Sequence, residues 1–261
     1  MQIYRQLFLA GANRPIRVWG NDWAKITEPQ DRETIPPSFY GRILVWTEID
    51  RDGKWLNQEK NKEATATEKA AIQIPPSLDP NFRSFNFVFL EERHLLILEY
   101  RNELGEHFGS VRAQKFFSTL FEEQLLGAET PEVAVTVIPS HEALDRIYAI
   151  PRLRRLEIYV LRPNPDDLAE DQQRLLDRLL KQGAKSQTLE LVKKAKVKTI
   201  TPDDETKRLA AIAVENGHVT GEGSDDGKPI LESTKDHPKI VVAEVKGGTS
   251  IATFFAALKL F

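Results

Sequence analysis

Basic side chains gather around two predicted strands in the middle of the chain, at residues 156–161 and 188–192. From Lys181 to Lys198 there are six lysines against one acid, Glu190. The residues that we predict to bind nucleic acid are Arg152, Arg154, Arg155, Lys193, Lys194, Lys196 and Lys198. A row of cations binds phosphates by displacing the counterions condensed on them. If the two strands share a sheet, these residues would form one basic surface.

The same lysines have a second interpretation. Lysine is common along exposed edge strands, where its charge blocks pairing with another chain. The chain carries 36 basic and 39 acidic side chains, a net charge of −3, so no overall charge draws it to nucleic acid or to an acidic membrane. Any such binding must come from a local patch.

A second group of residues could serve a metal-dependent reaction. Residues 240–246 form an apolar run that ends in Glu-x-Lys, and the order helix, three strands, helix from residue 203 onward resembles the core of PD-(D/E)xK nucleases. In this alternative Asp226, Glu244 and Lys246 would be catalytic, with carboxylates holding Mg²⁺ and the lysine orienting water. No Pro-Asp pair begins the second strand, and the histidines lack ligand spacing. We therefore expect no catalytic centre, metal or cofactor.

The hydrophobic pattern predicts an α+β fold. The N-terminal part should be a hairpin-rich sheet closed by a helix over residues 110–126, whose buried stripe includes Val111, Phe116 and Phe117. Its strands are predicted at residues 3–10, 41–49, 85–90 and 95–100, with a short return strand around Trp55. The charged stretch 57–68 is predicted to be a loop or a solvated helix.

A central βαβαβ unit is predicted next, with strands at residues 134–138, 156–161 and 188–192. Crossovers as short as these should be right-handed. A C-terminal α/β extension follows, with a helix at 203–216, strands at 219–223, 229–232 and 240–245, and a closing helix at 249–261. The segment at residues 128–131 is the best candidate for a domain boundary. We therefore predict an N-terminal domain over 1–127 and a C-terminal domain over 128–261.

Composition bears on location and assembly. Cysteine is absent, no stretch approaches the ~20 apolar residues of a membrane span, and the N-terminus lacks a basic leader. We expect a cytoplasmic protein without membrane insertion. The closing helix carries Phe254, Phe255 and Phe261, which could form a dimer contact or dock on their own domain.

Two stretches, Asn86–Phe121 and Pro202–Gly223 with Gly217-His218-Val219 at its centre, resemble the RexA family of phage exclusion proteins. The resemblance implies a cytoplasmic, homodimeric, sequence-nonspecific DNA-binding protein of a phage-defence system, in exclusion or abortive infection, without a catalytic centre. It assigns no individual binding residue. A third interpretation is a protein-interaction subunit of a defence complex, whose basic face meets an acidic partner.

Overall fold

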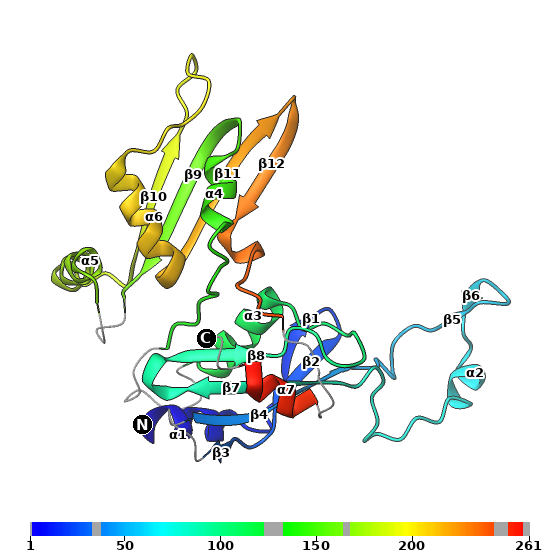
Figure 1. Cartoon of the computed structure of the whole chain (residues 1–261). Helices are drawn as coiled ribbons and strands as arrows, with labels where there is room; N and C mark the ends of the chain where they lie inside the picture. The colour runs from blue at the N-terminus through cyan, green and yellow to red at the C-terminus, as the bar shows by residue number, and fades with distance from the viewer. Residues whose placement is uncertain (1, 33–37, 123–132, 164–167, 243–249, 258–261) are drawn as a thin grey trace. The chain divides into compact units, whose positions relative to one another are not determined.

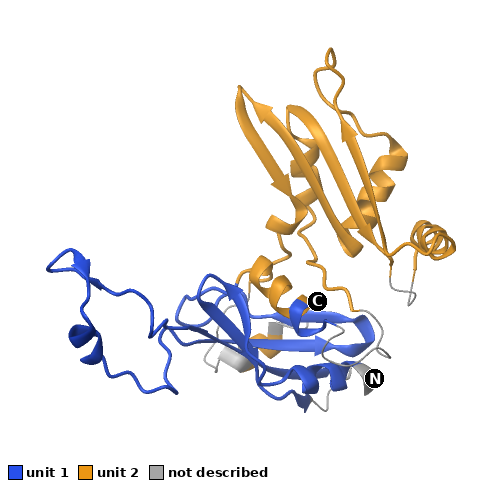
Figure 2. Cartoon of the chain, turned by 180° about the vertical axis from the view of Figure 1, so that it is seen from behind, with its two compact units in different colours: residues 1–108, 119–130 blue, residues 109–118, 131–261 orange. Residues whose placement is uncertain are grey.

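The computed structural model describes residues 2–32, 38–122, 133–163, 168–242 and 250–257, and it confirms the α+β class. The chain divides into two compact units, one made of residues 1–108 and 119–130 and the other of residues 109–118 and 131–261 (Figure 2). The predicted domain boundary, between residues 127 and 128, lies outside the described residues.

Most of the described strands of the first unit form a six-stranded antiparallel sheet in the order β1-β2-β4-β7-β8, with β3 also paired to β4 (Figure 1). This is the predicted N-terminal sheet. Its strands are β1 (Ile16–Trp19), β2 (Asp22–Ile26), β3 (Gln30–Arg32), β4 (Ser38–Thr47), β7 (Arg83–Leu90) and β8 (Leu95–Leu98). The predicted hairpin of β7 and β8 is present, joined by the short helix η1 (Glu91–Arg93).

The prediction of an opening strand at residues 3–10 is wrong, because α1 (Gln2–Gly11) occupies that position. Tyr4, Leu7, Phe8 and Gly11 recur at helical spacing, and this pattern is hidden within a run of mostly apolar residues. Phe8 is 1 % exposed and its ring lies 4.7 Å from that of Phe39. Packing of this aromatic face against the sheet therefore stabilises a helix at this position.

Two further predictions for the N-terminal half of the chain need correction. The segment between β4 and β7 does not return along β4: β5 (Leu56–Asn57) pairs instead with β6 (Lys62–Glu63), and α2 (Ala66–Ala70) follows. The predicted helix after residue 109 is present as α3 (Ser110–Leu120), with Phe116 and Phe117 buried. Val111, however, is 52 % exposed and does not belong to its buried stripe.

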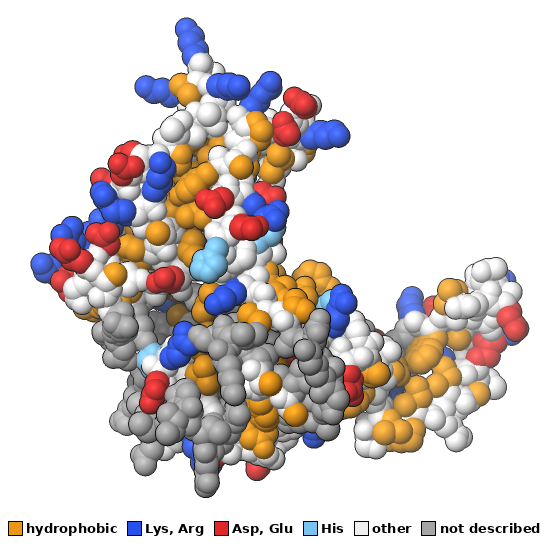
Figure 3. All heavy atoms as spheres, in the orientation of Figure 1, with side chains coloured by type: hydrophobic (Ala, Val, Ile, Leu, Met, Phe, Trp, Pro, Cys, Tyr) orange, Lys and Arg blue, Asp and Glu red, His pale blue; other side chains and the backbone are white. Residues whose placement is uncertain are grey.

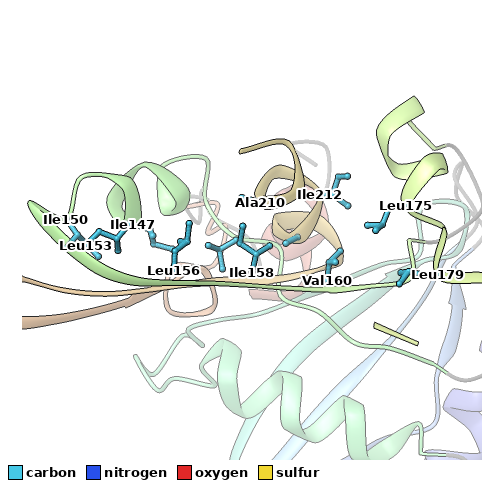
Figure 4. Packing of buried hydrophobic residues seen from close by; sticks show 12 residues of the cluster. Ile147, Ile150, Leu153, Leu156, Ile158, Val160, Leu175, Leu179, Ala210 and Ile212 are labelled. Atoms are coloured by element: carbon cyan, nitrogen blue, oxygen red, sulfur yellow. The ribbon is translucent and has the colours of Figure 1, made fainter. Parts of the chain in front are cut away.

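The described strands of the second unit form a four-stranded antiparallel sheet in the order β10-β9-β11-β12. The strands are β9 (Arg152–Leu161), β10 (Ser186–Val192), β11 (Gly217–Asp225) and β12 (Lys228–Ser233). Helix α4 (Ala143–Tyr148) precedes β9, α5 (Glu170–Lys181) connects β9 to β10, and α6 (Asp204–Asn216) connects β10 to β11. Alternate residues of β9, among them Leu156, Ile158 and Val160, are buried beneath the helices (Figure 4). The opposite face of the sheet carries charged side chains such as Arg155 and Glu222, and also the exposed hydrophobic residues Val192 and Leu231 that pair with them.

The central unit differs from its prediction in two ways. Residues 133–138 are irregular and not a strand, and the neighbouring Pro139, which lacks an N–H donor, forms only an isolated bridge with Pro238. The strands β9 and β10 are antiparallel neighbours, so α5 is not a parallel crossover. The βαβαβ order is therefore replaced by α4-β9-α5-β10.

The C-terminal predictions are partly confirmed. The helix α6 begins after Asp203, whose carboxylate accepts a hydrogen bond of 2.8 Å from the Thr206 N–H. This hydrogen bond lowers the pKa of Asp203 below its usual value. The described part of the closing helix is α7 (Ser250–Ala257). The described part of the strand predicted at 240–245 is irregular, with Val242 86 % exposed, and its remainder lies outside the described residues. Among the helices that the structure describes, none has the length and apolar character needed to cross a membrane.

Candidate nucleic-acid interface

The loop between β10 and α6 is fastened at both ends to the start of β9. The Lys193 N–H donates to the Arg154 carbonyl (2.8 Å), and the Ile200 N–H donates to the Leu153 carbonyl (3.0 Å). The Leu153 N–H in turn donates to the Thr199 hydroxyl (3.0 Å). These three bonds bring the lysines after β10 next to the arginines that begin β9.

The structure thus brings together six of the seven cations predicted to bind nucleic acid. We call this group the basic tip: Arg152, Arg154, Lys193, Lys194, Lys196 and Lys198. Five of the six are exposed, Lys193 being half-buried, and Figure 3 shows Lys and Arg side chains gathered at this end of the second unit. No acidic residue occurs in the sequence from Leu191 to Pro202. In the strand register, Asp225 and Asp226 follow Ser224, which pairs with Arg152, and Glu222 lies opposite Arg155, next to Arg154.

The members of the basic tip are not equivalent. The Lys193 ammonium donates to the carbonyls of Lys194 (2.9 Å) and Val197 (2.7 Å), within its own loop. Arg154 donates from Nη2 to the Gly223 carbonyl (3.3 Å), which still leaves it other donors. The side chains of Lys194, Lys196 and Lys198 extend into solvent. These three lysines are therefore the tip's most accessible charges.

Arg155 lies apart from the basic tip, on the open face of the sheet. Its guanidinium is 3.0 Å from Glu157, 2.8 Å from Glu190 and 3.0 Å from Glu222. The negative charges of Glu190 and Glu222, and to a smaller degree Glu157, raise the pKa of Arg155. Three carboxylates around one guanidinium leave this part of the face acidic, so it would repel phosphate.

The open face also holds a ring pair, Tyr159 and His218, with centroids 5.1 Å apart. Burial, aided by the charge of Lys235, lowers the pKa of His218 to about 4. Neither ring lies at the basic tip.

The His218 environment predicts an acid-labile contribution to stability. Because the folded-state pKa is below the unfolded value near 6.5, this contribution is complete above about pH 6.5 and declines toward pH 4, by at most about 3 kcal/mol. Urea unfolding across this range should show a steeper pH dependence for the wild type than for His218→Gln. Parallel curves would contradict this assignment.

The described residues do not contain an assembled catalytic centre of the nuclease type. Asp226 has φ 42 in the turn between β11 and β12, and Glu244 and Lys246 lie outside the described residues. Across the described ranges, no group of three His, Cys, Asp or Glu side chains is placed to hold a metal ion.

The described residues form an α+β protein with two large antiparallel sheets and a small two-stranded one, and the four-stranded sheet ends in a cluster of exposed cations. It belongs to the family described as a domain of unknown function, DUF4747, whose model matches residues 1–260. Comparison with curated proteins and with solved structures finds no match.

Sequence reasoning missed two features of the site. Arg155 is 67 residues from Glu222, and the pairing of β9 with β11 that joins them has no local signal. The sequence also gives no sign that the Lys193 ammonium donates to carbonyls of its own loop, because nothing local distinguishes Lys193 from Lys194.

Proposed function

We propose that this chain is a non-catalytic, sequence-nonspecific DNA-binding protein of a phage-defence system, acting in exclusion or abortive infection. The observation that carries the DNA-binding part is the fastening of the β10–α6 loop to β9, which concentrates exposed lysines and arginines at one end of the sheet. Contacts to phosphates are independent of sequence, which accounts for the nonspecific binding in the proposal.

The defence role rests on the resemblance of Asn86–Phe121 and Pro202–Gly223 to RexA-like phage exclusion proteins. The same resemblance supports a cytoplasmic location and a homodimer. Light scattering of the intact chain decides the oligomeric state. Phage challenge of cells that express the chain tests the defence role, since loss of basic-tip lysines should remove protection if DNA binding carries it.

Single substitutions in the basic tip test the DNA-binding part. We expect Lys194→Gln, Lys196→Gln or Lys198→Gln each to weaken duplex binding about equally for all sequences and to flatten the salt slope by about one unit. Fluorescence anisotropy with two unrelated duplexes measures both quantities. The matched control is Lys181→Gln, an exposed lysine at the end of α5. An unchanged slope in all three tip variants would contradict the proposal.

A further inference from the structure

We propose that the basic tip is a preformed surface for the sugar–phosphate backbone of duplex nucleic acid, in which Lys193 positions the loop and does not bind phosphate. The inference rests on the proposed function and specifies the form of nucleic acid and the role of each lysine. It also accounts for the half-buried state of Lys193 beside three exposed lysines.

The role of Lys193 follows from its hydrogen bonds. Its ammonium has three donors, and two of them are used on the carbonyls of Lys194 and Val197. The Val197 N–H donates back to the Lys194 carbonyl (3.2 Å), closing the turn. Lys193 therefore ties both ends of this turn to itself, while its own N–H is bonded to β9.

The preformed loop holds together positive charges that repel one another. Lys194, Lys196 and Lys198 are crowded into five residues without an acid between them, so their charges repel one another in the free protein. A flexible loop would spread them apart. The Lys193 bonds and the attachments to Arg154 and Leu153 hold the charges together instead, and neutralisation by a dense row of phosphates relieves the repulsion.

The side chains around the tip favour a duplex over a single strand. Binding of single strands depends on aromatic platforms on which bases stack. No Phe, Tyr, Trp or His occurs at residues 152–158, 191–202 or 225–231, the segments that form this end of the sheet. The Tyr159–His218 pair on the open face is separated from the tip by Arg155 and its three glutamates, which would repel a strand crossing the sheet.

The test compares Lys193→Met with Lys194→Met in the full chain. Each variant loses one charge, but only Lys193→Met loses the two hydrogen bonds from the ammonium to the carbonyls of Lys194 and Val197. Amide hydrogen exchange at Val197 should accelerate about tenfold or more in Lys193→Met and stay at the wild-type rate in Lys194→Met. This measurement requires no nucleic acid, so it judges the role of Lys193 even if the proposed function fails.

Binding to a duplex and to a single strand of equal length completes the test. We expect the wild type to prefer the duplex by about tenfold or more. Lys193→Met should weaken duplex binding with an unchanged salt slope, whereas Lys194→Met should flatten the slope by about one unit. Lys193→Arg, which keeps donors at this position, should restore part of the affinity. A flattened slope and unchanged exchange in Lys193→Met, or a preference for the single strand, would overturn the inference. Absence of any binding by the wild type would instead overturn the proposed function.

Discussion

Replacement of Lys194, Lys196 and Lys198 together by glutamine should weaken duplex binding roughly 100- to 1,000-fold at about 0.1 M salt. Each of these lysines is exposed, so each can release about one condensed counterion on meeting a phosphate. The fold should persist, because the loop is held by backbone bonds and by Lys193. Anisotropy titration measures the affinity, and circular dichroism verifies the fold.

The control for this triple variant has the same change in net charge elsewhere. Lys54, Lys62 and Lys181 are exposed and lie outside the basic tip. Their combined replacement by glutamine should change duplex affinity less than about fivefold, because isolated exposed lysines do not form the row of cations that displaces condensed counterions. Equal losses in the two triple variants would show that net charge, not the basic tip, governs binding.

Gly217→Ala should cost about 3 kcal/mol or more of unfolding free energy. Gly217 begins β11 opposite Val160, and an added Cβ would overlap the Tyr159 carbonyl oxygen and lie 3.1 Å from the Val160 Cα. Those atoms belong to β9, which is paired on both sides and cannot easily withdraw. Urea unfolding monitored by circular dichroism measures the difference.

Gly109→Ala is the matched control. A Cβ at Gly109 would meet nothing within 4 Å, so its stability should stay within about 0.5 kcal/mol of the wild type. Similar losses for the two variants would mean that the close approach of β9 to Gly217 is not what requires glycine there.

Several elements could be predicted because their signals are local. The alternation of Leu156, Ile158 and Val160 marks β9, and Asp203 and Gly217 mark the two ends of α6. Gly217 shows the limit of such signals: the sequence indicates a helix stop, whereas the structure reveals a backbone contact with a strand far away in the chain.

What failed depends on pairing between distant segments. The β-branched run at 134–138 has high strand propensity but no ladder partner among the described residues, so propensity alone misleads. The sequence groups Arg155 with its basic neighbours, yet its environment is set by Glu190 and Glu222, which the pairing of β9 with β10 and β11 brings to it. The basic tip itself could be predicted, since its two clusters flank strands that turned out to be neighbours.

The salt dependence of duplex binding by the wild-type chain tests the central claim most directly. With Arg152, Arg154, Lys194, Lys196 and Lys198 available for phosphates, the logarithm of the association constant should fall against the logarithm of salt concentration with a slope of roughly −4.5. The slope should be the same for unrelated sequences. No retention of duplex at micromolar protein and low salt, or a slope near zero, would contradict the account.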